Sequence, residues 1–462
     1  MNTTRWILIF TLLVAAVQIQ LGQKQKPPEG ETPKDFTLPS KQAVTLKNGL
    51  SLTLVPYGAL PKVTVSIVIR AGNVNEEANE VWLADLVGDL MKEGTASRSA
   101  QQIAEEAAGM GGSVNIGVGP DQTSIRGDVL SEFGPKLVSL LADIVRNPLF
   151  PESELPRLKN DQIRQLTVAK SQPRQLTMEQ FHKILYGEHP YGRIFPTESM
   201  LQSYTIEKVR DFFEKNFGAG RTSIYVVGRF DDRAMEKAVR DAFETWQKGP
   251  HPLVNIPKTS ARRAFHLIDR PGAPQSTIYL GLPVINPAEK NYVPLLVTNA
   301  LLGGSFGSRI TSNIREQKGY TYSPSSTVSV RYRDAYWVQV ADVTTESTGP
   351  ALEEIFKEID RLQAEPPSTE ELKGIQNYLS GTFVLQNSSR GGIIGQLSFL
   401  RLHGLGDDYL SNYVQNVHSV TPQQVSEITR RQIRDEKMIL VITGDKKMIE
   451  KQIEEYARIA PE

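Results

Sequence analysis

The sequence predicts an α+β fold made of two homologous α/β halves, each an antiparallel or mixed sheet covered by helices. Short runs that alternate apolar and polar residues are typical of strands, and longer runs with apolar residues at helical spacing are typical of helices. Both kinds of run occur before and after residues 247–262, a segment that is rich in proline and basic residues and has little periodicity. We expect this segment to link an N-terminal domain, residues 41–246, to a C-terminal domain, residues 263–462.

A repeated motif near the end of each half indicates that the chain is internally duplicated. In both copies a helix that opens with Thr leads to an apolar strand closed by Gly. The matched positions lie at one constant separation: Thr205 with Thr421, Val209 with Val425, Ile224 with Leu440 and Gly228 with Gly444. Because the order of the elements repeats as well as the residues, duplication explains the match better than chance.

The first half opens with two β-rich runs around Asn48-Gly49, a pair that suits the tight turn of a hairpin. Gly94 ends the helix that begins at Leu83, and Ser99 is the expected N-cap of the next one. The expected strands are 43–46, 50–55, 63–70, 112–117, 123–129 and 223–227. The further helices are expected at 99–108, 131–146, 152–169, 176–185 and 205–217.

The second half repeats this alternation of strands and helices. Strands are expected at 264–268, 276–282, 322–330 and 335–343, and helices at 292–302, 308–316, 349–363 and 368–385. The helix at 292–302 is the counterpart of the first-half helix that begins at Leu83.

Composition excludes several classes of protein. The chain has 462 residues, a formal net charge of +0 and no cysteine. The length suggests at least two domains. Without a basic block or interleaved basic and aromatic residues, we expect no nucleic-acid partner. Without cysteine, the chain can form no disulfide and offers no thiolate to a metal.

Residues 1–22 are predicted to be a signal peptide, because Arg5 precedes an apolar run, 6–17, that contains small residues near its end. The run is too short for a comfortable membrane span, and an uncleaved N-terminal anchor is the alternative. Residues 23–40 are rich in Lys, Pro, Glu and Gln and are expected to form a flexible leader. We therefore expect an exported protein, periplasmic or secreted, with no membrane span after signal removal.

The stretch from Trp82 to Thr95 combines features that helix stability alone does not favour. Its apolar residues recur at helical spacing and define one buried face. Asp85 and Asp89 stand about one turn apart, so their like charges share another face. Gly88 between them costs about 1 kcal/mol relative to alanine in a helix interior. A solvated face with a tolerated glycine is the alternative interpretation.

The frame Leu83-Ala84-x-Leu86-x-x-x-Leu90-x-x-x-Gly94-Thr95 resembles the zinc helix of the pitrilysin/insulinase family of metallopeptidases, which carries H-x-x-E-H. In that motif two histidines bind zinc and the glutamate is the general base. The histidine positions are Asp85 and Asp89 here, the glutamate position is Gly88, and the family's third ligand falls on Gln165. The resemblance implies the family's fold, whose two halves face each other like a clamshell, and a degenerate zinc site.

A second part of the resemblance lies in the other half. A small-residue loop, 303–308, precedes a helix that ends in the family frame R-E-x-x-G-x-x-Y-S, here with Arg315 and Tyr322. The loop lacks the Lys-Ser/Thr of a phosphate-binding loop, so nucleotide binding is rejected. The resemblance implies that Arg315 and Tyr322 donate to the attacked carbonyl of a substrate. From the residues alone, a salt bridge for Arg315 and a packed strand position for Tyr322 are the alternatives.

Other metal sites have little support in the sequence. The 6 histidines include no pair at the spacing that lets one helix present two imidazoles. Asp85, Asp89 and Gln165 offer oxygen atoms of the kind that Ca²⁺ and Mg²⁺ prefer, but such ions take about six or more oxygens. We expect no metal on this chain, and whether the two aspartates bind another cation stays open.

The resemblance implies an exported subunit without zinc that completes the active site of a zinc-bearing homologous partner. Arg315 and Tyr322 would contact a peptide or unfolded polypeptide, zinc would sit in the partner, and the chain alone would bind no cofactor and be inactive. A second hypothesis is a catalytically inactive structural or peptide-binding scaffold. A third is an autonomous zinc peptidase with altered ligands, against which the absence of a general base at Gly88 argues.

Overall fold

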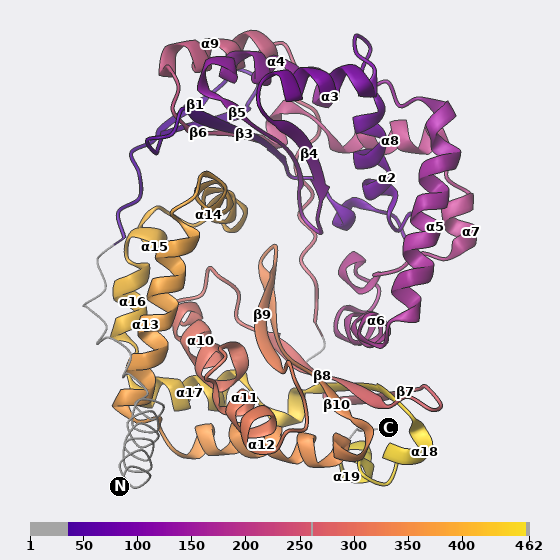
Figure 1. Ribbon diagram of the computed structural model, residues 1–462, viewed down its shortest axis with the longest axis vertical. Helices are drawn as coiled ribbons and strands as arrows, with labels where there is room; N and C mark the ends of the chain where they lie inside the picture. The colour runs from indigo at the N-terminus through magenta and orange to yellow at the C-terminus, as the bar shows by residue number, and fades with distance from the viewer. Residues whose placement is uncertain (1–35, 260–261, 459–462) are drawn as a thin grey trace, which may run out of the picture. The chain divides into compact units, whose positions relative to one another are not determined.

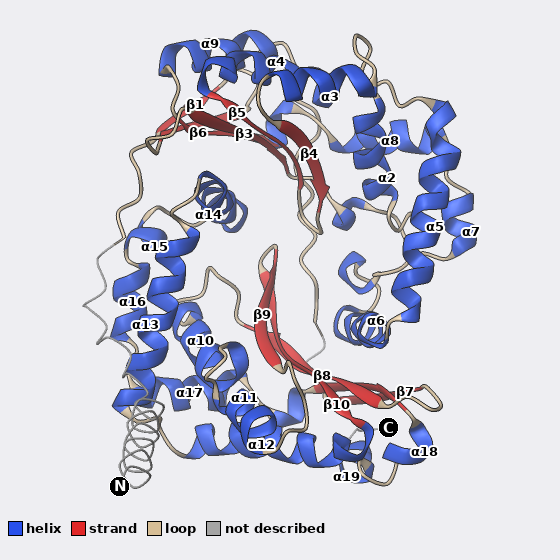
Figure 2. Cartoon of the chain, in the orientation of Figure 1, coloured by secondary structure: helices blue, strands red, loops and turns tan. Residues whose placement is uncertain are grey.

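The computed structural model describes residues 36–259 and 262–458. Helices pack on two mixed β-sheets (Figure 1, Figure 2), so the predicted α+β fold is confirmed. The expected signal peptide, residues 1–22, and most of the expected leader, residues 23–40, lie outside the described residues. Within the described ranges, no helix is long and apolar enough to cross a membrane.

The first sheet has six strands in the order β1-β2-β6-β3-β5-β4. Its strands are β1 (Gln42–Thr45), β2 (Ser51–Pro56), β3 (Lys62–Ile69), β4 (Ser113–Val118), β5 (Thr123–Leu130) and β6 (Thr222–Gly228). The helices of this half are α2 (Leu83–Leu90), α3 (Ala100–Gly109), α4 (Gly134–Arg146), α5 (Leu155–Ser171), α6 (Pro173–Tyr186), α7 (Glu198–Gln202), α8 (Ile206–Asn216) and α9 (Asp232–Phe243). The predicted hairpin turns at Gly49, whose φ of 90° explains the glycine.

The second sheet has five strands in the order β7-β11-β8-β10-β9. Its strands are β7 (Ala264–Asp269), β8 (Gln275–Val284), β9 (Ser325–Arg331), β10 (Asp334–Thr344) and β11 (Ile439–Gly444). The helices of this half are α10 (Tyr292–Asn299), α11 (Arg309–Thr311), α12 (Thr348–Ala364), α13 (Thr369–Gln386), α14 (Arg390–His403), α15 (Asp408–Ser411), α16 (Tyr413–Ser419), α17 (Pro422–Gln432), α18 (Lys446–Ile449) and α19 (Glu454–Arg458).

Two expectations for the second half need correction. The strand expected at 322–330 begins at Ser325, so Tyr322 lies before it. The helices expected at 292–302 and 308–316 are α-helical only in part, because they continue as the π-helices η7 (Ala300–Gly304) and η8 (Ser312–Gln317). Short π-helical segments are rare and frequently mark functional sites.

The two sheets share one connectivity around the repeated strand. β6 lies parallel to β2 and antiparallel to β3. In the same way, β11 lies parallel to β7 and antiparallel to β8. Ile224 faces Ile67 across its sheet, and the matched Leu440 faces Leu280. The repeat in the sequence therefore corresponds to a repeat in topology.

Each half contributes one helix to the sheet of the other half. Phe181 of α6 packs with Tyr279 and Val441 of the second sheet. Leu397 of α14 packs with Val68 and Tyr225 of the first sheet. Phe181 and Leu397 stand at the same separation as the repeated positions. The exchange is therefore reciprocal, and each of these two helices packs on the sheet of the opposite half.

The segment that follows α9 runs without helix or strand through residues 247–259. Its start is bound to the first half, because the backbone N–H of Gly220 donates to the Lys248 carbonyl at 2.8 Å. The buried Arg221 guanidinium also donates to the Pro250 carbonyl at 3.2 Å. This segment lies within the expected linker, and the domain boundaries at 246 and 263 stay predictions.

Candidate functional site

The first candidate site is α2, the helix that carries three of the changed zinc positions. Its buried face consists of Leu83, Leu86, Val87 and Leu90. Asp85 and Asp89 are both half-buried and lie on the face of α2 that points away from these four residues. The predicted apolar face and the predicted position of the two carboxylates agree with the structure, because both depend only on helical periodicity.

Asp85 is held in a hydrogen-bonded cluster that the sequence did not reveal. The Asn73 amide donates to Asp85 Oδ2 at 2.7 Å and to Glu76 Oε1 at 3.1 Å. Glu76 is only 6% exposed and also accepts the Ala84 backbone N–H at 2.9 Å. Burial raises the pKa of Glu76 to about 8 and the pKa of Asp85 to about 6, although these hydrogen bonds favour the charged forms. The Asp85 side chain is therefore part of a hydrogen-bonded cluster with Asn73 and Glu76 that holds the start of α2.

Gly88, at the position of the general base, faces the first sheet. A Cβ atom built there would lie 2.8 Å from Cγ2 of Val118 and 3.6 Å from Cγ2 of Ile116, both on β4. The first of these distances is shorter than real Cβ contacts, so any side chain at this position would require the Val118 side chain, β4 or α2 to shift. The glycine allows α2 to pack closely on the sheet, and the space that a glutamate would need is filled by valine.

The other two zinc positions also have different surroundings. Asp89 forms an ion pair with Lys92 at 2.8 Å, one turn along the helix. Gln165 of α5 is exposed, and its side chain forms no hydrogen bond with any residue that the structure describes. The α5 residue that reaches α2 is Gln162, which is 2% exposed and donates to the Trp82 carbonyl at 3.2 Å. Among the described residues, no hydrogen bond joins Gln165 to either aspartate.

These surroundings do not fit a zinc ion. Zinc sites use three or four imidazole, thiolate or carboxylate ligands that converge on one point. Among residues 36–259 and 262–458, no group of three or more His, Cys, Asp or Glu residues is arranged to hold a metal. The carboxylate of Asp85 is already hydrogen-bonded and Asp89 is ion-paired, so α2 offers no set of free donors.

The second candidate site is carried by η8, by the loop before α11 and by the segment between η8 and β9. The Arg315 guanidinium lies between two aromatic rings, with its carbon 4.5 Å from the centroid of Phe306 and 4.9 Å from that of Tyr322. Its Nε is 3.2 Å from Oε1 of Glu316. Tyr322 is 80% exposed and Phe306 is 67% exposed, so the rings stabilise the cation at the surface. Arg315 and Tyr322, predicted as a pair, are in contact.

Buried groups behind η8 fix the direction in which Arg315 points. The buried Asn313 amide donates to Glu354 Oε2 at 2.7 Å and to Glu358 Oε1 at 2.9 Å, both on α12. The Thr321 hydroxyl donates to the Asp342 carbonyl at 2.7 Å, which holds the chain next to Tyr322. Arg315 and Tyr322 therefore project from an anchored backbone, a requirement for preorganised donors.

The sequence interpretation missed three members of these sites. Asn73 and Glu76 were not distinguished from other polar residues before α2, because their role depends on contacts with that helix. Phe306 carried a usable signal, since a large aromatic residue in a glycine and serine loop has no local structural reason. Its contact with Arg315 is established only by the fold.

Comparisons with known proteins agree on one family. The family model described as Insulinase (Peptidase family M16) matches residues 58–196, and the one described as Peptidase M16 inactive domain matches residues 203–379. An uncharacterized zinc protease from Rickettsia felis is 28% identical over 318 residues, which are 68% of this chain and 75% of that protein.

Two solved structures have the same fold. The peptidase M16 inactive domain from Pseudomonas fluorescens superposes with a TM-score of 0.80 at 24% identity, over 87% of this chain and 98% of that one. A protease from Helicobacter pylori superposes with a TM-score of 0.82 at 18% identity, over 88% of this chain and all of that one, 100%.

The contact between Gly88 and Val118 predicts a measurable coupling. Alanine in place of a helical glycine usually stabilises by up to about 1 kcal/mol, but overpacking against Val118 costs about 1–3 kcal/mol. We expect Gly88→Ala to be less favourable by about 1–3 kcal/mol in the native chain than in a Val118→Ala background. Urea unfolding of the four proteins measures this coupling. Gly381→Ala, on the open face of α13, is the control, and equal effects of Gly88→Ala in both backgrounds would contradict the packing.

Burial of Glu76 predicts a pH-dependent stability. Because its pKa is raised from 4.5 to about 8 in the folded chain, the folded state binds more protons than the unfolded state between these values. The free energy of unfolding should therefore fall as pH rises through this window, by at most about 1.4 kcal/mol per pH unit for this group. Glu76→Gln should flatten the profile, whereas Glu188→Gln at an exposed site should not. Superimposable profiles for Glu76→Gln and the native chain would refute this account.

Proposed function

Because the chain belongs to the insulinase family of peptidases, peptidase family M16, we propose that it is the subunit without zinc of a heteromeric peptidase. In this proposal a homologous partner carries the zinc, and this chain supplies Arg315 and Tyr322 to the shared site. The substrate is a peptide or an unfolded polypeptide. The observation that carries the proposal is a contrast between two sites. The zinc positions of α2 are all changed, whereas Arg315 and the exposed Tyr322 project from an anchored backbone.

The changed residues of α2 and their contacts support the absence of a zinc site in this chain. Asp85 accepts a hydrogen bond from Asn73, Asp89 forms an ion pair with Lys92, and Gly88 packs closely against Val118. A family peptidase needs two imidazoles, a further ligand and a general base at these positions. All of those groups would have to come from another subunit.

The Arg315–Tyr322 pair supports a role in stabilising charge on a substrate. A guanidinium and a phenol are both hydrogen-bond donors, and a carbonyl oxygen under attack becomes more negative. The Arg315 side chain is 24% exposed and contacts the rings of Phe306 and Tyr322. In this proposal the pair orients the scissile carbonyl, and the partner provides the metal and its water.

The second candidate function is a scaffold or peptide-binding protein without any catalytic role. The buried carboxylates and close packing of α2 agree equally well with this function. The exposure of Tyr322 and Phe306 favours the first candidate, because aromatic side chains kept only for packing are normally buried. The two functions differ in whether the pair affects turnover by the complex.

Export is the remaining part of the proposal. It is supported by the Arg5 residue and the apolar run that follows it in the sequence. We infer a periplasmic or secreted protein that meets its partner after export. Detection of the mature chain in the exported fraction, with the first residues removed, tests this inference.

The first prediction for this function concerns zinc. The purified mature chain should contain far less than one zinc per chain and should hydrolyse no peptide, because α2 offers no converging free ligands. Elemental analysis and a fluorogenic peptide assay measure both quantities. Stoichiometric zinc together with chelator-sensitive cleavage by the isolated chain would instead establish an autonomous peptidase.

The second prediction concerns the donor pair in the reconstituted complex. Arg315→Ala and Tyr322→Phe should each lower kcat by about 10²–10³, the usual effect of removing one preorganised donor. The zinc content of the partner and the assembly of the complex should not change. Steady-state kinetics and gel filtration measure these properties.

Two controls accompany this test. Tyr320→Phe removes a phenol hydroxyl close by, and Arg434→Ala removes a surface guanidinium, and neither should alter kcat. A rise in KM with kcat unchanged would restrict the pair to binding the ground state. Full activity of both Arg315→Ala and Tyr322→Phe would leave the scaffold as the better function.

A further inference from the structure

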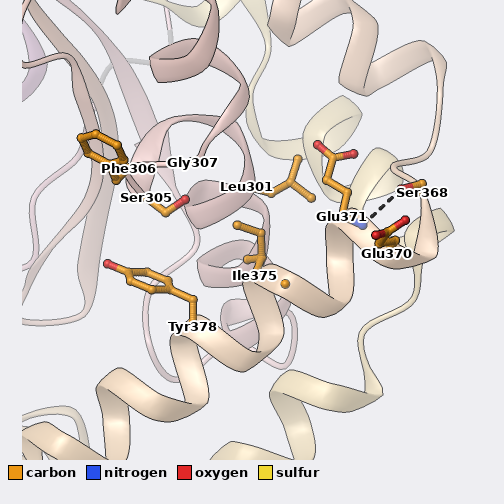
Figure 3. Close-up of a pocket in the computed structure, with 10 residues that line it drawn as sticks. Leu301, Ser305, Phe306, Gly307, Ser368, Glu370, Glu371, Ile375 and Tyr378 are labelled. Atoms are coloured by element: carbon orange, nitrogen blue, oxygen red, sulfur yellow. Dashed lines mark hydrogen bonds between the residues drawn. The ribbon is translucent and has the colours of Figure 1, made fainter. Parts of the chain in front are cut away.

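A pocket of about 550 Å³ lies between the loop at 305–307 and α13 (Figure 3). Its volume is in the range of sites that bind small ligands or short peptide segments. Ser305 and Phe306 lie on one side, and Ile375 and Tyr378 of α13 lie on the other. Because Phe306 also contacts Arg315, the pocket adjoins the proposed donor pair.

Gly374 forms an open part of the pocket wall. It lies in the middle of α13, where glycine costs about 1 kcal/mol relative to alanine. A Cβ atom built at Gly374 would meet nothing within 4 Å, so packing within the chain does not require glycine there. The glycine keeps the wall free of side chains, which suggests that an occupant lies against it.

The two ends of the pocket differ in chemistry. Phe306 and Tyr378, 67% and 48% exposed, form an aromatic end. Glu370 and Glu371 lie at the other end, and the Arg309 guanidinium pairs with both oxygens of Glu371 at 2.7 and 2.8 Å. Glu370 forms no ion pair with any described residue. The acidic end therefore has one carboxylate available to a positively charged group.

The spacing of the two ends suits an extended peptide. Glu370 and Tyr378 are eight residues apart on one α-helix, or about 12 Å at 1.5 Å per residue. An extended chain covers this distance in about four residues, at roughly 3.3 Å each. The Ser305 hydroxyl lines the same pocket, is buried and has no hydrogen-bond partner among the described residues. A peptide backbone would supply such a partner.

We propose that this pocket binds an extended segment of the peptide substrate, with an apolar side chain between Phe306 and Tyr378 and a lysine or arginine side chain at Glu370. The inference rests on the proposed function in one respect, that the substrate is a peptide. It adds a specificity site beside the Arg315–Tyr322 pair. Aromatic contacts provide the apolar part of the binding, and Glu370 selects a basic residue about four positions away.

Binding of fluorescein-labelled peptides to the purified mature chain alone tests the proposal by anisotropy. The probes carry Phe and Lys four positions apart in a glycine and serine background, in both orders, with Gln in place of Lys as the neutral comparison. Gly374→Leu fills the pocket and should weaken binding at least about tenfold. Gly381→Leu is the matched control, because Gly381 lies on the same helix with equally open surroundings and does not line the pocket.

Glu370→Gln tests the charge preference. It should weaken binding of the Lys probe by about two- to fivefold, as expected for one partly exposed ion pair, and leave binding of the Gln probe unchanged. Glu207→Gln is the control, since Glu207 is an exposed glutamate in the first turn of another helix. Thermal unfolding confirms that all variants fold.

Any of the following outcomes would overturn the proposal: no binding by the native chain, equal binding by Gly374→Leu and Gly381→Leu, or equal effects of Glu370→Gln on both probes. Loss of partner assembly in Gly374→Leu with peptide binding intact would assign the pocket to the partner and also overturn it. These results are separable from the proposed function. Peptide binding is measured on the isolated chain, whereas the role of Arg315 and Tyr322 is measured as turnover by the complex.

Discussion

The packing of Phe181 against Gly281 illustrates the constraint on which the rest of the structure depends. A Cβ atom at Gly281 would lie 2.8 Å from Cζ of Phe181 and 2.5 Å from the carbonyl oxygen of Trp337, so α6 fits on the second sheet only because this position is glycine. Leu397 of α14 makes the reciprocal contact with the first sheet. Each sheet is complete only when the other half is folded, which couples the two halves and holds the strands that support both candidate sites.

In the first candidate site, α2 corresponds to the helix that carries the zinc motif in the family, and here its residues contribute hydrogen bonds and packing. Asn73, Glu76 and Asp85 form a cluster in which two carboxyl groups share one amide donor. Burial raises the pKa of both carboxyl groups and favours their neutral forms, and the charge of Asp85 raises the pKa of Glu76 further. Gly88 adds close contact with Val118. These interactions stabilise the position of α2 and occupy the groups that a metal would need.

The second candidate site is maintained by a different kind of interaction. Arg315 has one neighbouring carboxylate and two aromatic faces, so its charge is stabilised without being fully paired. Behind it, Asn313 is fixed by two glutamates of α12. An arginine held in this way retains hydrogen-bond donors for a ligand, which distinguishes it from an arginine engaged in a bidentate, partly buried ion pair such as Arg309 with Glu371.

The sequence was enough to predict the α+β class, most of the helices and strands other than α14, and the chemical nature of each zinc position. These features depend on local periodicity and on residue identity, and an aspartate or glycine cannot supply an imidazole whatever the fold. The family frame also predicted Arg315 and Tyr322 as a functional pair. Three contacts became known only with the fold: Val118 faces Gly88, Asn73 binds Asp85, and Phe306 lies on Arg315. Such contacts join residues that belong to different elements or loops, and their geometry arises only when the sheets and helices pack together.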